Sequence, residues 1–297
     1  MKRVLILGGS GMLGHKLVQE WRERFDVWTT VRGNFKALER FGFFNPQKTM
    51  TAVSAENFDS VIDAFAIAKP DVVVNCIGVI KQLAAAKDPI QTLTINSIFP
   101  HRIAKLCGVT GTRFITLGTD CVFSGTRGNY SEADAPDATD LYGRSKYLGE
   151  VNTDNCLTVR TSIIGRELGT SHSLIDWLLS KRGQNETIRG FTNAVFTGFP
   201  TIVLADLLAD LIENYSQLQG TWHVSSNPIN KFELLKLVNK KFKANLEIEP
   251  YSDFYCDRSL DSSRFRTETN FKPQSWAEMV TRMTDDPTPY DQFHHLW

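Results

Sequence analysis

The first half of the chain alternates between short apolar runs and longer segments whose apolar residues recur at helical spacing. The apolar runs have the length of buried strands and lie at residues 4–7, 27–31, 49–53, 72–78, 113–117 and 159–164. The helical segments between them lie at residues 15–24, 56–68 and 89–107. We expect Pro100 to kink or divide the last of these helices. Strands that alternate with helices favour βαβ units, so the pattern predicts an α/β fold of Rossmann type with a doubly wound parallel sheet.

The second half of the chain is patterned less regularly. Helical spacing and one further apolar run occur at residues 173–180, 202–215 and 221–224 and around Trp276, while residues 190–200 are rich in aromatic and turn-forming residues. We therefore expect two interleaved domains. A dinucleotide-binding domain would span residues 1–165, with residues 201–226 returning to it, and a smaller mixed α/β substrate-binding domain would span residues 166–200 and 227–297.

Four glycines in seven residues follow the first expected strand, and an expected helix follows them. They can be described as Gly9-x-Gly11-x-x-Gly14 or as Gly8-x-x-Gly11-x-x-Gly14. Glycines allow a tight turn and close approach to a pyrophosphate, and the start of the helix adds free N–H groups. A plain strand-to-helix turn is the alternative, but so many glycines favour a dinucleotide site. Its expected members are Gly8, Ser10, Gly11, Met12, Leu13 and Gly14.

The residue that follows the second strand bears on the choice of cofactor. Proteins that prefer NAD usually carry an Asp or Glu about 20 residues past the glycines, which bonds the ribose 2′-OH. Here the strand runs into Val31-Arg32 without an acid, and Arg32 could instead accept a 2′-phosphate. We therefore expect NADPH as the cofactor, with NADH as the alternative. The alternative for Arg32 is a solvated loop cation.

Residues at the ends of later strands should border the same ligand, because ligands of open α/β sheets bind outside the carboxyl ends of the strands. This argument places Asn75, Cys76, Ile77 and Gly78 beside the cofactor. Asn96 lies in the helical segment that follows. It either supports the site or is a residue of the helix surface.

Tyr142 and Lys146 are four residues apart, so on a helix they would share one face. A positive charge near a phenol favours the phenolate and lowers the pKa of the tyrosine. The pair is therefore suited to proton donation to a carbonyl oxygen near neutral pH. Thr119 follows the fifth strand, 23 residues before Tyr142. It is either a β-branched strand terminus or a hydroxyl that hydrogen-bonds a substrate carbonyl.

Composition and charge narrow the class of protein. The chain has 297 residues, of which 33 are basic and 33 acidic, and a nucleic-acid partner, which normally requires a basic excess, is not expected. No apolar run approaches the ~18 residues of a membrane span, so we expect no membrane association. The 5 cysteines contain no Cys-x-x-Cys pair and indicate reduced thiols in a cytoplasmic protein. No group of residues suggests a metal site.

Taken in order, these motifs resemble the extended short-chain dehydrogenases/reductases and, among them, the dTDP-4-dehydrorhamnose reductase-like family. The resemblance rests on the glycine turn, Asn75-Cys-Ile-Gly78, Thr119-Asp-Cys-Val-Phe-Ser-Gly125, Tyr142-Gly-Arg-Ser-Lys146 and Val159-Arg-Thr-Ser162. Asp257-Arg-Ser-Leu-Asp261 is similar to a further segment of the family but lacks its proline after the arginine. The likeness is strong to about residue 165 and looser beyond.

The resemblance implies a catalytic group of Thr119, Tyr142 and Lys146. Tyr142 would donate a proton to the keto oxygen as hydride arrives from the nicotinamide. Lys146 would lower the pKa of Tyr142 and bind the nicotinamide ribose, and Thr119 would orient the carbonyl. Cys121 departs from the family, which often carries tyrosine there. Sugar-nucleotide 4,6-dehydratases place a glutamate at this position, so Cys121 argues against dehydration.

The substrate side is expected to come from the resemblance and from the second half of the chain. Its expected residues are Thr119, Asp120, Cys121, Val122, Phe196 and Arg258. Arg258 suits bidentate contact with a diphosphate, and its alternatives are an exposed cation or an ion pair with a neighbouring aspartate. Phe196 either stacks on a nucleotide base or belongs to the core.

We therefore expect a cytoplasmic, NADPH-dependent enzyme that reduces the 4-keto group of a nucleoside-diphosphate-linked 4-keto-6-deoxy sugar. Such a reaction belongs to deoxysugar (rhamnose-like) and polysaccharide biosynthesis; the keto position and the sugar come from the resemblance alone. One alternative is a sugar-nucleotide 4-epimerase. Another is a non-catalytic, NADP-binding regulatory subunit similar to that of methionine adenosyltransferase. We expect a monomer or homodimer whose partner is a nucleoside-diphosphate sugar.

Overall fold

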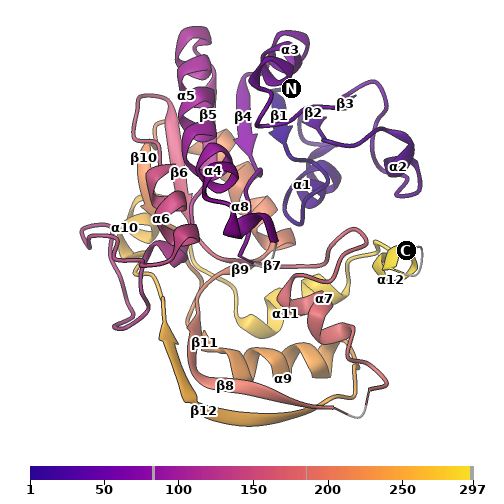
Figure 1. The fold of residues 1–297 in the computed structure, drawn as a ribbon, viewed down its shortest axis with the longest axis vertical. Coiled ribbons are helices and arrows are strands. Elements are labelled where there is room, and N and C mark those ends of the chain that lie inside the picture. Colours follow the sequence, from indigo (N-terminus) through magenta and orange to yellow (C-terminus); the bar gives the residue numbers. More distant parts are fainter. Residues whose placement is uncertain (82–83, 185, 295–297) are drawn as a thin grey trace. The chain divides into compact units, whose positions relative to one another are not determined.

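The fold is described from a computed structural model of the chain (Figure 1). The structure describes residues 1–81, 84–184 and 186–294. Contacts between Cα atoms divide the chain into two compact units, which are interleaved along the sequence. The first comprises residues 1–118, 139–159 and 205–221, and the second comprises residues 119–138, 160–204 and 222–297. This division groups residues 119–138 with the second unit, whereas the boundaries expected from the sequence place them in the dinucleotide-binding domain.

The first unit is built on a seven-stranded sheet with the strand order β10-β6-β5-β4-β1-β2-β3. Its strands are β1 (Arg3–Leu7), β2 (Asp26–Thr30), β3 (Thr49–Met50), β4 (Val72–Asn75), β5 (Arg113–Leu117), β6 (Cys156–Arg160) and β10 (Gly220–His223). All pairs from β6 to β3 are parallel. The chain builds outward from β1 to β3 and then returns to place β4 on the other side of β1. This reversal confirms the predicted doubly wound sheet of Rossmann type.

Successive residues of a strand point to opposite faces of the sheet. The sheet therefore has two faces, and helices pack against it. On one face, Leu5, Leu7 and Val73 form a hydrophobic core with α3 (Phe58–Ala68) and α5 (Phe99–Thr110). Neither α1 (Gly14–Trp21) nor α8 (Thr201–Asn214) contributes to that core. Instead these two helices are joined by a hydrogen bond of 2.9 Å, which Trp21 donates from Nε1 to the carbonyl of Ala205.

Pro100 divides the helical segment at residues 89–107, as expected. The segment consists of α4 (Pro89–Leu93), a π-helical turn at Thr94–Ile98 and then α5. A proline cannot donate to the carbonyl four residues earlier, and its ring clashes with that carbonyl, which here belongs to Asn96. The wider π-helical turn absorbs this mismatch, and such turns are frequent at functional sites.

The expected strand at residues 159–164 has the wrong boundaries. The sheet strand β6 ends at Arg160, and Ile163–Ile164 form a separate short strand, β7, which pairs with β9 (Phe199–Pro200). Apolar and β-branched residues run through both pieces, so the pattern alone does not separate them. The third strand is also shorter than expected, because it ends at Met50 rather than at residue 53.

The second unit contains a small mixed sheet with the order β11-β8-β12. β12 (Glu247–Asp257) runs parallel to β8 (Thr187–Phe196), while β11 (Ile229–Asn230) is antiparallel to it. The helix α9 (Lys231–Lys241) packs on β8. The long strand β8 covers a segment for which the sequence indicated turns, and the amphipathic helix expected near Trp276 is α11 (Trp276–Thr284). Further helices are α2 (Lys36–Glu39), α6 (Leu141–Leu148), α7 (Leu174–Leu179), α10 (Ser263–Thr269) and α12 (Tyr290–His294).

Candidate active site

Close contacts shape the glycine turn between β1 and α1. Gly8 has a φ of +85°, and a Cβ there would lie 2.9 Å from Cγ1 of Ile77. A Cβ on Gly14 would lie 2.1 Å from the carbonyl oxygen of Gly8. Gly11 differs, because its Cβ would meet only that same oxygen, at an ordinary 3.4 Å. The protein therefore needs Gly8 and Gly14 for its own packing, whereas the open space at Gly11 suits the close approach of a ligand.

The backbone amides of this turn are available to an anion. Among the described residues, none accepts a hydrogen bond from the amides of Ser10, Met12 or Leu13, and Leu13 caps α1 without a side-chain bond. The carbonyl of Gly11 is held by His15, whose backbone nitrogen and Nδ1 lie 3.0 and 2.8 Å from it, so that Nδ1 must carry a proton. Free amides at the start of a helix form a site for a phosphate or diphosphate.

Arg32 is exposed two residues after the end of β2. It lies in the field of the Glu56 carboxylate. Hydrogen bonds from Gln91 and Ser54 lower the pKa of Glu56, and the charge of Arg32 lowers it further. The position after the second strand thus carries a cation that a ligand can reach, flanked by one anionic group.

The turn after β4 lies against the glycine turn, as the contact between Gly8 and Ile77 shows. Asn75 ends β4, is buried, and donates from Nδ2 to Oγ1 of Thr116 at 3.2 Å. Its Oδ1 accepts from the amide of Ile77 at 3.0 Å. Burial raises the pKa of Cys76 to about 12, so this thiol is not a nucleophile at neutral pH. Gly78 is exposed beside them.

Tyr142 and Lys146 both lie on α6, which begins immediately after Asp140. Oδ1 of Asp140 caps the helix by accepting from the amide of Gly143 at 2.9 Å. Lys146 donates from Nζ to the carbonyl of Leu117, at the end of β5, over 2.7 Å. Burial lowers the pKa of Lys146 to about 8, which leaves the ammonium largely protonated at neutral pH.

Asn96 joins α6 to the turn after β4. Its Oδ1 accepts from the amide of Val79 at 2.9 Å, and its Nδ2 donates to the Val79 carbonyl and to Oγ of Ser145, both at 3.1 Å. The side chain is buried, so Asn96 is not a residue of the helix surface. Its backbone carbonyl lies so close to Gly149 that a Cβ there would be 1.8 Å from the oxygen. Asn96 therefore positions the helix that carries Tyr142 and Lys146.

The expected substrate residues at 119–122 lie in the second unit. Thr119, Asp120 and Val122 are buried, and Cys121 is partly exposed. Oγ1 of Thr119 accepts a hydrogen bond of 3.1 Å from the amide of Cys121. The structure thus shows Thr119 capping the short turn that follows it.

Arg258 also lies in the second unit, and it is committed to the backbone of the same loop. Its Nε donates to the carbonyl of Phe123 at 2.8 Å and its Nη2 to that of Ser124 at 3.3 Å, while Nη1 lies 3.9 Å from Sγ of Cys121. The arginine fastens the loop at 121–124 to the end of β12. Phe196 is buried, with its ring 5.7 Å from that of Trp276, as expected for a core residue.

Sequence reasoning missed two residues of the first unit that support these groups. His15 holds the glycine turn, as described above. Nζ of Lys81 lies 2.9 Å from Oδ2 of Asp140 and 5.4 Å from the centroid of the Tyr142 ring. Neither residue belongs to a motif with fixed spacing, so no signal in the sequence alone could have identified it.

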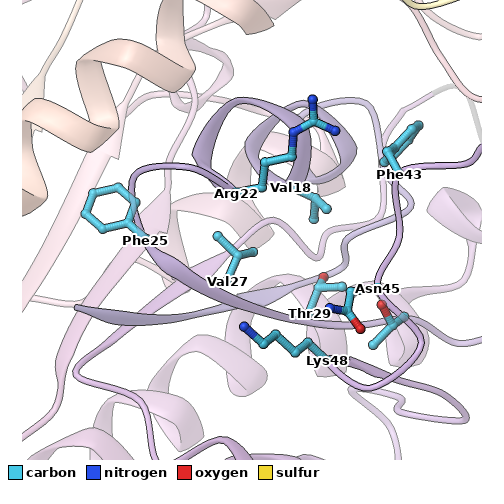
Figure 2. A pocket seen from close by; sticks show the side chains of 9 residues that line it. Val18, Arg22, Phe25, Val27, Thr29, Phe43, Asn45 and Lys48 are labelled. Atoms are coloured by element: carbon cyan, nitrogen blue, oxygen red, sulfur yellow. The ribbon is translucent and has the colours of Figure 1, made fainter. Parts of the chain in front are cut away.

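A separate hollow lies between α1 and the edge of the sheet (Figure 2). Figure 2 shows Val18 of α1, and Arg22 immediately after that helix, above Val27 and Thr29 of β2. None of the site residues expected from the sequence lines it. Within the described residues, no group of acidic, histidine and cysteine side chains could bind a metal ion. In the same part of the chain, no helix has the length and apolarity that a membrane crossing requires.

The doubly wound sheet, the glycine turn and the Tyr142–Lys146 helix braced by Asn96 define a protein of the extended short-chain dehydrogenase/reductase class. The chain belongs to the family of the RmlD substrate binding domain, whose model matches residues 1–288. This confirms the family inferred from the sequence.

Similar proteins include reductases and a subunit of methionine adenosyltransferase. The chain is 28% identical to the probable low-salt glycan biosynthesis reductase Agl14 of Haloferax volcanii, over 74% of this chain and 73% of that protein. It is 25% identical to methionine adenosyltransferase 2 subunit beta of Xenopus tropicalis, over 78% of this chain and 70% of that protein. The dTDP-4-dehydrorhamnose reductase of Bacillus anthracis, solved in complex with NADP, superposes with a TM-score of 0.78 at 23% identity, covering 95% of this chain and 98% of that one. This last likeness supports the fold.

Proposed function

We propose that the protein is an NADPH-dependent reductase of the keto group of a nucleoside-diphosphate sugar. The observation that carries the proposal is the combination, in one compact unit, of a glycine turn whose amides have no acceptor with Tyr142 and Lys146 on a braced helix. Membership of the RmlD substrate binding domain family and the similarity to a probable glycan biosynthesis reductase support it. The finer assignment, a 4-keto-6-deoxy sugar of deoxysugar biosynthesis, rests on the resemblance.

The residues present fit a dinucleotide. The open space at Gly11 and the amides of Ser10, Met12 and Leu13 would bind its diphosphate. Arg32 would contact a 2′-phosphate, which is why NADPH is favoured over NADH. The turn at residues 75–78 would border the cofactor. When bound, NADPH supplies the hydride for the reduction.

The proton comes from the protein in this proposal. The hydroxyl of Tyr142 donates it to the carbonyl oxygen of the substrate, which becomes the alcohol. The positive charge of Lys146 favours the tyrosinate that remains, and Lys146 is anchored for this task by its bond to the Leu117 carbonyl. Lys146 would also bind the nicotinamide ribose, and Thr119 would orient the carbonyl; both roles come from the resemblance. Asp120, Cys121 and Val122 are proposed to border the sugar on the same ground.

The test is NADPH oxidation with a panel of nucleoside-diphosphate 4-keto-6-deoxy sugars. Wild type and Tyr142→Phe are assayed in parallel, with NADPH binding measured for both. We expect turnover by the wild type on at least one sugar, and a loss of at least ~100-fold in the variant with NADPH binding retained. Binding of NADPH without turnover on any sugar would contradict the proposal.

The similarity to a methionine adenosyltransferase subunit favours a second candidate, a non-catalytic binding subunit. It would bind NADPH through the same turn but make no use of Tyr142. Co-purification with methionine adenosyltransferase, unaffected by Tyr142→Phe, would support this candidate. Absence of such a complex together with sugar turnover would exclude it.

A further inference from the structure

Lys81 contacts the helix that carries the proposed proton donor, from outside the Tyr-x-x-x-Lys motif. It lies on the loop that follows β4, in the same compact unit as α6. Its ammonium is 2.9 Å from Oδ2 of Asp140 and 5.4 Å from the centroid of the Tyr142 ring. A cation at this distance over an aromatic face is attracted by the ring quadrupole.

Asp140 links the two contacts. One of its carboxylate oxygens caps α6 through the amide of Gly143, and the other pairs with Lys81. Tyr142 is the second residue of that helix, so the cap and the ion pair act at the same turn. The loop before Lys81 is fixed as well, since both backbone groups of Val79 are hydrogen-bonded by Asn96. The hydrogen bonds to Val79 therefore hold the backbone two residues before Lys81, the residue that contacts Tyr142.

We propose that Lys81 is a positioning residue for Tyr142: its ammonium holds the phenol ring by a cation–π contact and adds a positive charge that favours the tyrosinate. This inference rests on the proposed function for its purpose but not for its geometry. Asp140 opposes the effect, because its carboxylate partly neutralises the Lys81 charge. The pKa of Tyr142 should therefore lie between the value expected with the Lys81 charge alone and the value expected without that charge.

Among the described residues, several other charged or titratable groups lie near α6. Lys146, Arg144 and Tyr147 lie on the helix itself, and the elements packed against it, η1 (Ala84–Lys87) and α4, contribute Lys87 and the capping Asp88. At the end of the helix, the charge of Glu150 acts on Lys146, and Nε2 of His101 lies 2.8 Å from the Leu148 carbonyl. The π-helical turn at Thr94–Ile98, which also packs on α6, carries no charged residue. All these groups are unchanged in variants of Lys81 and Asp140, so a change in the titration of Tyr142 can be assigned to the pair.

The experiment titrates Tyr142 directly, without substrate or cofactor. Near-ultraviolet tyrosinate absorbance is followed against pH for each protein, and the curve of the same protein carrying Tyr142→Phe is subtracted. The variants are Lys81→Met, which removes the charge, Lys81→Arg, which keeps it, and Asp140→Asn, which removes the opposing charge while an asparagine still caps the helix. Circular dichroism checks that each remains folded over the pH range.

We expect the midpoint of Tyr142 to rise by about 0.5 pH unit in Lys81→Met, given the partial exposure of the pair. It should stay within error of wild type in Lys81→Arg and fall in Asp140→Asn. A purely structural role would move the Met and Asn variants in the same direction, and that result, or no shift in Lys81→Met, would overturn the inference. The titration needs no turnover. The inference about Lys81 can therefore hold even if the protein is not a reductase, and it can fail even if the protein is one.

Discussion

Replacing Gly14 with alanine should destabilise the fold, whereas the same replacement at Gly11 should not. The new Cβ at residue 14 would lie 2.1 Å from the Gly8 carbonyl oxygen, more than 1 Å inside an ordinary contact, and would also lie 2.9 Å from the carbon of that carbonyl. These are backbone atoms of a turn whose own bonds fix it, so they cannot rotate away. Overpacking of this kind costs ~1–3 kcal/mol. The better helix propensity of alanine offsets less than ~1 kcal/mol of it.

At Gly11 the new Cβ would meet the same oxygen at 3.4 Å, which is ordinary contact, and its φ is not among the positive ones. Restricting the unfolded chain should even stabilise Gly11→Ala by a few tenths of a kcal/mol or more, up to ~1 kcal/mol. The added methyl would nevertheless occupy the space into which we propose that the diphosphate enters. Gly11→Ala should therefore be at least as stable as wild type and bind NADPH at least ~10-fold more weakly.

Urea unfolding of both variants, with NADPH titrations by fluorescence, separates the two effects. The reasoning about packing is refuted if Gly14→Ala unfolds at the wild-type midpoint. The reasoning about the ligand is refuted if Gly11→Ala binds NADPH as tightly as wild type. A variant that loses both stability and binding at Gly11 would show that the turn has less room than the contact distances indicate.

Three further predictions concern the supports of the fold. Asn96→Ala leaves both backbone groups of Val79 without their buried partner and should lower the unfolding free energy by ~2–4 kcal/mol, measured by urea denaturation; a cost below ~0.5 kcal/mol would contradict the bracing role. Burial lowers the pKa of His223 to about 4, so between pH ~6.5 and 4 this histidine takes up its proton only in the unfolded state. The free energy of unfolding should therefore fall by up to ~3 kcal/mol as the pH drops through this window. His223→Gln should flatten this dependence on pH, and a variant with the same dependence as wild type would refute the assignment. Asp176→Ala removes the buried partner of Arg166 and should lower the free energy of unfolding by ~3–5 kcal/mol. Asp291, which pairs with the same arginine, has a side chain that is 61% exposed, so Asp291→Asn should lower it by at most ~1 kcal/mol. Equal losses in the two urea unfolding curves would count against the burial argument.

The fold of the first unit could be predicted because its central strands β1 and β4 are mostly apolar and segments of helical spacing separate the strands. β1, β4 and β5 have buried residues on both faces, so apolar residues fill most of their positions. The second unit lacks this signal. β12 is largely exposed and carries acidic and aromatic residues without strict alternation, and β8 contains a glycine against which Phe232 packs too closely for a Cβ. Their pairing is a tertiary property that no local pattern encodes.

The residues of the candidate site likewise fall into those that the sequence indicates and those that only the structure reveals. The glycine turn and the Tyr142–Lys146 pair have fixed spacings, which is why the sequence indicates them. The role of Arg258 depends on which atoms face its guanidinium, and the structure shows two backbone carbonyls where the sequence left a free cation or an ion pair as alternatives. Lys81 and His15 act through contacts with residues whose positions only the fold defines.

A single backbone irregularity connects these supports. Pro100 cannot donate to the carbonyl of Asn96, and the π-helical turn directs that carbonyl to the end of α6, where only a glycine at position 149 leaves room for it. The same residue's side chain bonds Ser145 on α6 and Val79 after β4. One asparagine thus sets the position of α6 through its backbone and of the neighbouring loop through its amide. Lys81 lies at the end of that loop and Tyr142 lies on that helix. The position of Pro100, which shapes the turn at Asn96, therefore influences the distance between Lys81 and Tyr142.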